Sequence, residues 1–177
     1  MRLFVGLPLP HMARESLASL QSGAPGARWV APKNLHLTLR FIGDVDNGQA
    51  EDIDLALASI RSPAFQLTLV GVGHFGSGRR MRALWAGVER SQPLDHIHEK
   101  VESAVVRAGL PPEGRKFTPH VTLARFKRGA ASKVGPYLEA NNGFSLAPFQ
   151  IQSFALFQSH LSHAGADYQI LTTYPLD

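Results

Sequence analysis

Two four-residue segments carry the side chains best suited to chemistry in this chain of 177 residues. They read His-Leu-Thr-Leu at residues 36–39 and His-Val-Thr-Leu at residues 120–123, and they lie 84 positions apart. In a β-strand, residues two apart project from the same face, so the histidine and threonine of each segment share a face. One such pair is weak evidence of function. Two copies half a chain apart predict two halves that bring two imidazoles together.

Two histidines on one face suit the hydrolysis of a phosphodiester near neutral pH. One neutral imidazole takes a proton from water while a protonated one donates a proton to the leaving oxygen. The hydroxyls of Thr38 and Thr122 can donate hydrogen bonds to non-bridging phosphate oxygens. We therefore interpret His36 and His120 as an acid and base pair, although a structural role is the alternative for each motif taken alone.

Two arginines follow the motifs. Arg40 continues the alternation of His36 and Thr38, so it is predicted to reach the same face. Arg125 follows His120 by five positions, which is the wrong parity for a regular strand, so it reaches that face only if the strand bends, bulges or ends early. Either guanidinium could hold a phosphate through two parallel hydrogen bonds. Exposure to solvent without a ligand is the alternative for both.

The spacing between the motifs extends to other segments and predicts an internal duplication. Phe-Gln-Leu at 65–67 lies 29 positions after the first motif histidine, and Phe-Gln-Ile at 149–151 lies 29 positions after the second. Each half then reads as strand, helix, motif strand, helix, strand, within a single domain over residues 1–177. The expected strands are 2–7, 34–42, 65–72, 83–88, 119–126, 149–157 and 168–174, and the expected helices are 11–21, 49–60, 94–108 and 131–140.

Composition narrows the class of protein. A hydrophobic content of 44% excludes wholesale disorder, and a net charge of +4 favours anionic partners such as nucleotides or RNA. The absence of cysteine rules out disulfides, thiolate catalysis and cysteine-ligated zinc. No segment approaches the roughly 20 apolar residues of a membrane span, and the start has no signal-peptide pattern. We therefore expect a cytoplasmic protein without a membrane partner.

Two loops and four further histidines could also bind ligands. The glycine-rich basic segment 73–80 lacks the Gly-Lys-Ser/Thr ending of a phosphate-binding loop, so it is predicted to be a hairpin tip, with contact to RNA backbone as the alternative. Segment 159–163 is the equivalent tip of the second half. His96, His98, His160 and His163 lack a third ligand, so a solvated or capping role is expected and no metal or cofactor is predicted.

Three longer strings resemble a known family. They are Arg-Leu-Phe-Val at 2–5, Trp-Val-x-Pro-x-Asn-Leu-His-Leu-Thr-Leu-Arg-Phe-Ile-Gly at 29–43, and Phe-Thr-Pro-His-Val-Thr-Leu-Ala-Arg at 117–125. The chain resembles the 2H phosphoesterase superfamily over essentially its whole length. Within that superfamily it is most similar to the bacterial and archaeal RNA 2′,3′-cyclic phosphodiesterases, also called 2′-5′ RNA ligases.

This resemblance implies an α+β fold of two pseudo-symmetric lobes, each with an antiparallel sheet and flanking helices, around a V-shaped central cleft. It implies metal-independent hydrolysis of RNA 2′,3′-cyclic phosphate ends to 2′-phosphomonoesters. His36 matches the family's proton donor and His120 its proton acceptor. Thr38, Thr122 and Arg125 match substrate-binding positions.

The expected partners are RNA ending in a 2′,3′-cyclic phosphate or small cyclic nucleotides, and the chain is expected to act as a monomer without a cofactor. Reversible 2′-5′ ligation of RNA, or hydrolysis of another cyclic phosphate in the same site, is an alternative within the same chemistry. A non-catalytic RNA-binding protein and a metal-dependent nuclease are alternatives from other classes.

Overall fold

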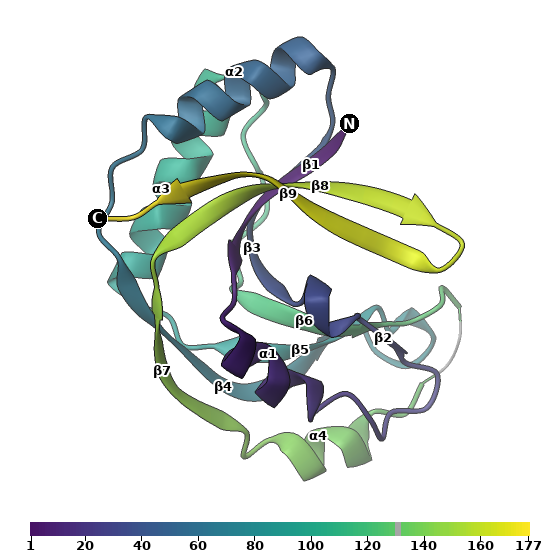
Figure 1. The fold of residues 1–177 in the computed structure, drawn as a ribbon. Helices are drawn as coiled ribbons and strands as arrows, with labels where there is room; N and C mark the ends of the chain where they lie inside the picture. The colour runs from purple at the N-terminus through teal and green to yellow at the C-terminus, as the bar shows by residue number, and fades with distance from the viewer. Residues whose placement is uncertain (130–131) are drawn as a thin grey trace.

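The computed structural model describes residues 1–129 and 132–177, and within them it combines one antiparallel sheet with four α-helices (Figure 1). The strands are β1 (Arg2–Pro8), β2 (Arg28–Trp29), β3 (His36–Asp44), β4 (Phe65–Phe75), β5 (Ala83–Val88), β6 (His120–Arg125), β7 (Ser145–Ile151), β8 (Ser153–Ser162) and β9 (Gly165–Pro175). The helices are α1 (His11–Ala18), α2 (Asn47–Ala58), α3 (Gln92–Arg107) and α4 (Gly135–Asn141).

The sheet consists of two four-stranded halves that meet at its centre. The strand order is β7-β4-β5-β6-β3-β1-β8-β9, with the short β2 paired to β6. Strands β6 and β3 join the halves through the pair Leu37 and Val121. Strand β4 pairs with β5 and β8 pairs with β1, so the last strand of each sequence repeat completes the sheet of the other.

The pairing register supports the internal duplication. Leu37 pairs with Val121, and Gln66 pairs with Gln150 across β4 and β7, and the members of each pair are 84 positions apart in the sequence. A residue that pairs with its own repeat equivalent lies on a local two-fold axis. The two motif strands therefore meet at the pseudo-symmetry axis of the chain.

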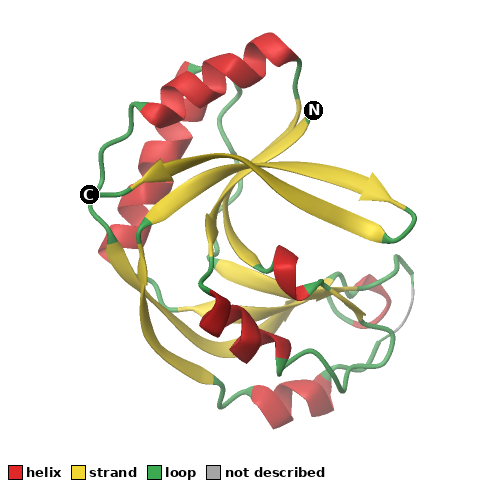
Figure 2. Ribbon diagram, in the orientation of Figure 1, coloured by secondary structure: helices red, strands yellow, loops and turns green. Residues whose placement is uncertain are grey.

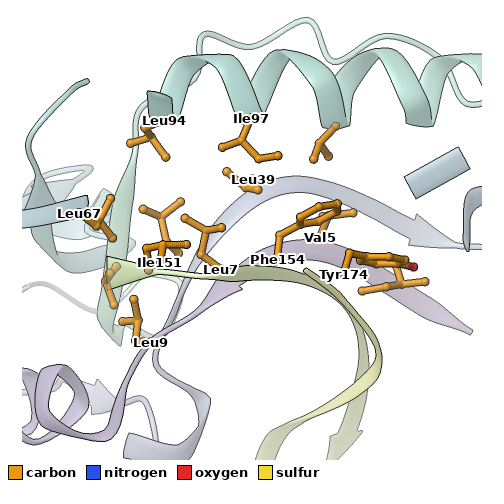
Figure 3. Close-up of a cluster of buried hydrophobic side chains, with 14 of the residues drawn as sticks. Val5, Leu7, Leu9, Leu39, Leu67, Leu94, Ile97, Ile151, Phe154 and Tyr174 are labelled. Atoms are coloured by element: carbon orange, nitrogen blue, oxygen red, sulfur yellow. The ribbon is translucent and has the colours of Figure 1, made fainter. Parts of the chain in front are cut away.

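Helices α2 and α3 cover one face of the sheet beside the central strands (Figure 2). The side chain of Ser91 accepts a hydrogen bond from the Leu94 amide and caps the start of α3. Helix α3 then presents a stripe of fully buried residues at helical spacing, namely Leu94, Ile97, Val101, Ala104 and Val105. This stripe packs against Leu7, Leu39 and Ile151 from the sheet (Figure 3). The core thus lies on the α3 side of the central strands.

Two expected elements differ from the structure, and one observed strand was not expected. The strand expected at 149–157 is two strands, because the chain changes partner at Gln152 from β4 to β1. The start of the helix expected at 131–140 lies outside the described residues, and the helix that is described begins at Gly135. Strand β2 was not expected, since two residues give no periodicity. None of the described helices has the length and apolar character needed to cross a membrane.

Candidate active site

Both motifs lie on the face of the sheet that is turned away from α3. Residues directly opposite in an antiparallel pair point to the same face, and Leu37 and Val121 are both fully buried. Their sequence neighbours therefore project from the opposite face. We call this surface the histidine face; its motif residues are His36, Thr38, His120 and Thr122. The structure thus brings together the four motif side chains that the sequence analysis singled out.

Each catalytic candidate is oriented by the carbonyl two residues before it. His36 Nδ1 lies 2.7 Å from the Asn34 carbonyl oxygen, and His120 Nδ1 lies 2.6 Å from that of Thr118. A carbonyl oxygen only accepts, so Nδ1 of each ring carries the proton and donates it. In the neutral ring, Nε2 is then the basic nitrogen. Thr38 Oγ1 lies 2.8 Å from His36 Nε2 and donates to it.

Aromatic side chains enclose the His36 ring. The ring centroid lies 4.8 Å from that of Phe4, 5.6 Å from Phe157 and 5.3 Å from Tyr168, which is perpendicular to the imidazole. The buried side chain of Asn34 donates to the Ala166 carbonyl of β9 at 2.9 Å, which fixes the segment that orients His36. The contacts that hold the first histidine therefore come from β1, β8 and β9 of its own half-sheet.

The His120 ring has a more open aromatic setting. Phe75 meets it edge-on at 4.9 Å between centroids, and Trp85 lies 6.2 Å away. Phe75 and Phe157 occupy equivalent positions, since Phe157 pairs with β1 and Phe75 with β5 at the matching place in each half. The local two-fold axis thus extends to the aromatic residue beside each histidine.

The electrostatics of the site favour neutral imidazoles. Burial, together with the charges of Arg125 and His120, lowers the pKa of His36 to about 4, against the opposing effect of the Asn34 carbonyl. Burial also lowers the pKa of His120, again with the charge of Arg125 and against the Thr118 carbonyl. A bound phosphate would offset the positive charge and favour an imidazolium.

A β-bulge places Arg125 on the histidine face. Trp85 pairs with Thr122 while Leu84 pairs with Ala124, so Leu123 is an extra residue in β6. Alternation restarts after the bulge, and Arg125 then shares the face of Thr122 and Trp85. The parity objection from the sequence is removed by this local geometry. The shared effect of Arg125 on both histidines agrees with the placement.

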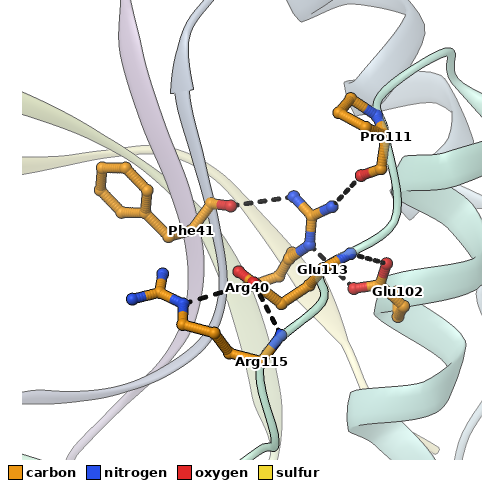
Figure 4. A network of polar contacts seen from close by, with 6 residues as sticks. All are labelled: Arg40, Phe41, Glu102, Pro111, Glu113 and Arg115. Atoms are coloured by element: carbon orange, nitrogen blue, oxygen red, sulfur yellow. Dashed lines mark hydrogen bonds and ion pairs between the residues drawn. The ribbon is translucent and has the colours of Figure 1, made fainter.

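The same bulge in β3 turns Arg40 away from the site. Gly6 pairs with Thr38 and Val5 with Arg40, so Leu39 is the extra residue. Arg40 therefore follows the buried Val5 toward α3, and its side chain is only 6% exposed. Its Nε donates to Glu102 Oε2 at 2.8 Å, and its two terminal nitrogens donate to the carbonyls of Phe41 and Pro111 (Figure 4). The prediction that Arg40 reaches the cleft is wrong.

Arg90 and His98 fix the backbone that orients His120, and no pattern in the sequence predicted this role for them. Arg90 donates two hydrogen bonds to the Phe117 carbonyl, at 2.9 and 3.1 Å. The His98 ring stacks on the Phe117 ring with 3.8 Å between centroids and 3° between planes. Phe117 directly precedes Thr118, whose carbonyl binds His120. Among residues 1–129 and 132–177, no group of three or more His, Asp or Glu side chains is placed to hold a metal ion.

Gly6 lies beneath the His36 ring, and we predict that Gly6→Ala displaces it. A Cβ at this position would lie 2.8 Å from the Leu37 carbonyl oxygen and 3.3 Å from His36 Cδ2. Since a misplacement of about 1 Å can cost 10²-fold in rate, we expect kcat for a cyclic nucleotide to fall by about 10- to 100-fold. Gly114→Ala is the matched control because a Cβ there meets nothing within 4 Å. Equal kcat for the two variants would contradict this placement.

Comparison with known proteins gives the same assignment as the motifs. A family model described as the 2′-5′ RNA ligase superfamily matches residues 8–162. The RNA 2′,3′-cyclic phosphodiesterase of Aeropyrum pernix is 37% identical over 161 residues, covering 89% of each chain. That of Geobacillus stearothermophilus is 28% identical over 98% of this chain, which spans 56% of that relative's length. The crystal structure of E. coli LigT complexed with 3′-AMP matches with a TM-score of 0.82 and 28% identity, over 99% of this chain and 97% of LigT.

The resemblance drawn from the three motif strings is confirmed, and the chain belongs to the 2′-5′ RNA ligase superfamily.

Proposed function

We propose that this protein hydrolyses RNA 2′,3′-cyclic phosphate ends to 2′-phosphomonoesters, with two histidines as acid and base. The observation that carries the proposal is the convergence of two His-x-Thr pairs at the junction of β3 and β6. The relatives from Aeropyrum pernix and Geobacillus stearothermophilus are RNA 2′,3′-cyclic phosphodiesterases, which supports the substrate class. One chain supplies both pairs, which favours action as a monomer.

In the proposed reaction, His120 Nε2 removes a proton from water as the water oxygen bonds to phosphorus. The bond between phosphorus and the 3′ oxygen breaks, and His36 donates the proton on Nε2 to that oxygen. The phosphate remains on the 2′ oxygen. Thr122 donates a hydrogen bond to a non-bridging oxygen, and the Arg125 guanidinium offsets the charge that develops on the phosphate.

Thr38 links the protonation of His36 to substrate binding. Its hydroxyl donates to the bare Nε2 of the neutral ring at 2.8 Å. Once Nε2 carries a proton it becomes a donor, so the Thr38 hydroxyl can no longer donate to it. The hydroxyl is then available to a phosphate oxygen. Protonation of His36 and binding of the anionic phosphate therefore favour each other.

The proposal is tested with 2′,3′-cyclic mononucleotides and short oligonucleotides, by identifying the position of the product phosphate with ³¹P NMR. A 2′-phosphate formed in EDTA at the same rate as without it is the expected result. A 3′-phosphate would overturn the assignment of donor and acceptor. Activity lost in EDTA and restored by a divalent ion would identify a metal-dependent nuclease. Binding without turnover would identify an RNA-binding protein.

We predict that kcat/KM and kcat each depend on pH in a bell shape, and that the two profiles peak at different pH values because one reports the free protein and the other the protein with bound substrate. The donor must be protonated, so the rate falls as pH rises through its pKa; the acceptor must be neutral, so the rate falls as pH drops through its pKa. Because both pKa values lie below the ordinary 6.5 in the free protein, kcat/KM should peak on the acid side of pH 6.5. The bound phosphate stabilises the imidazolium, so the kcat profile should peak at higher pH.

The two profiles are measured with one 2′,3′-cyclic mononucleotide at constant ionic strength. The limbs belong to the coupled pair rather than to one residue. A kcat/KM that still rises above pH 8 would contradict the lowered pKa values.

A further inference from the structure

Arg28 lies beside Arg125 on the histidine face. Strand β2 contributes two residues to the sheet, pairing Arg28 with Arg125 and Trp29 with Ala124. Directly opposite residues share a face, so Arg28 projects with Arg125. Trp29 points the other way and packs with the buried Ala124. The sequence analysis passed over Arg28, because no periodic pattern marks so short a strand.

Two arginines in this arrangement repel each other unless an anion lies between them. Like charges directly opposite in a sheet destabilise it. Both side chains are exposed, and among residues 1–129 and 132–177 neither forms an ion pair with a carboxylate. The pairing of these two arginines is therefore unfavourable by itself, and an anionic ligand would offset their repulsion.

A third arginine lies at the same end of the face. The guanidinium carbon of Arg82 is 5.7 Å from the centroid of the Phe75 ring, and that ring meets His120 edge-on. The backbone of Arg82 bonds to β4 and to the end of β6, through the Phe75 carbonyl and the Phe126 amide. The Arg82 guanidinium thus lies over the aromatic ring that contacts His120, and its backbone directly precedes Ala83, the residue that pairs with Arg125.

In the half of the site around His36, two positive side chains among the described residues are paired with carboxylates. Near His36, Lys33 is paired with Asp167 at 2.8 Å, and at the outer end of β1 Arg2 lies 3.6 Å from Asp44. On the β2 and β6 side, by contrast, Arg28, Arg82 and Arg125 form no ion pair with a carboxylate among residues 1–129 and 132–177. This asymmetry gives a direction to any polyanion that reaches both histidines.

We propose that Arg28 and Arg82 form a second phosphate site, which binds the 5′ phosphodiester of the terminal nucleotide while its cyclic phosphate lies between the histidines. This inference rests on the proposed function and extends it to the chain on the 5′ side of the reacting end. Arg125 faces the cyclic phosphate, since the bulge in β6 places it on the histidine face. Arg28 pairs with Arg125 from β2, at about 4.8 Å strand spacing, and Arg82 directly precedes Ala83, which pairs with Arg125 from β5, so Arg28 and Arg82 flank Arg125 on its two sides. The substrate class is then an RNA strand or a 5′-phosphorylated cyclic nucleotide.

The test compares a 2′,3′-cyclic mononucleotide with the same nucleotide bearing a 5′-phosphate. Wild-type protein should prefer the 5′-phosphorylated form by about 10-fold or more in kcat/KM, mainly through KM, as expected for one charge-assisted contact. Arg28→Gln and Arg82→Gln should each reduce this preference by several-fold, and Arg28→Lys should retain part of it. Arg61→Gln, an exposed arginine just after α2, is the matched control and should keep the wild-type preference.

A preference that is unchanged in Arg28→Gln and Arg82→Gln would overturn the second site. An equal loss on both substrates would also overturn it, because these residues would then act on the cyclic phosphate itself. Calorimetric binding of a nucleoside 2′-phosphate with and without a 5′-phosphate separates this inference from the proposed function. A binding preference that Arg28→Gln abolishes, in a protein that hydrolyses neither substrate, would keep the phosphate site and reject the hydrolysis.

Discussion

His120→Ala is expected to lower kcat for a 2′,3′-cyclic mononucleotide by about 10²-fold or more, because the variant has no group to take the proton from the attacking water. His36→Ala should cost a similar factor, since the 3′ oxygen would leave without a proton. The two losses should not add in the double variant, because both groups serve one transition state. The measurement is kcat for the two single variants and the double variant at the optimum pH of the wild type.

The fold should survive these substitutions. Both rings lie on the histidine face, opposite the fully buried Leu37 and Val121, so alanine leaves the packing against α3 in place. Urea unfolding of each variant checks this point. His96→Ala, an exposed histidine on α3, is the matched control and should retain wild-type kcat. Wild-type activity in either single variant, His36→Ala or His120→Ala, would exclude the acid and base assignment.

Regular strand alternation was enough to predict which face the motif residues occupy, but it gave the wrong face for the arginines that follow the motifs. His36 and Thr38 precede the extra residue in β3, so their shared face follows from the period of two. Arg40 and Arg125 lie after a bulge, and the bulge reverses the parity of both. The inserted residue is a leucine within an apolar run in each case, so nothing in the sequence marks it. The predicted roles of these two arginines depended on information that only the pairing register contains.

The duplication likewise predicted the elements of each half but not their partners. The offset of 84 positions placed Gln66 and Gln150 at equivalent positions, and they lie opposite each other in the structure. The exchange of β4 and β8 between the half-sheets could not be predicted, because local periodicity does not choose between distant partners. Arg28 and Arg90 depend on such long-range contacts. Arg28 pairs with Arg125 across β2 and β6, and Arg90, just before α3, donates to the Phe117 carbonyl. Residues that act through long-range contacts can be recognised only in the three-dimensional structure.

Glu102→Ala is expected to lower the free energy of unfolding by about 3 kcal/mol, the second large effect that the structure predicts. The Arg40 side chain is 6% exposed and that of Glu102 24% exposed, and the carboxylate also accepts a hydrogen bond from the Glu113 amide at 3.1 Å. Removing the carboxylate leaves a buried guanidinium without its counter-charge, which costs far more than losing a surface pair. Urea unfolding at neutral pH measures the difference.

Asp167→Ala is the matched control, because it breaks an exposed pair with Lys33 and should leave the free energy of unfolding close to that of the wild type. The double variant Arg40→Met with Glu102→Leu should recover much of the lost stability, since apolar side chains of similar size remove both buried charges together.

The variant Arg40→Met alone tests whether Arg40 lies outside the active site. Under conditions where this variant is folded, its kcat/KM should stay within about 2-fold of wild type, because Arg40 lies toward α3 with Val5. A large loss of kcat/KM under conditions where the variant is folded would instead return Arg40 to the histidine face.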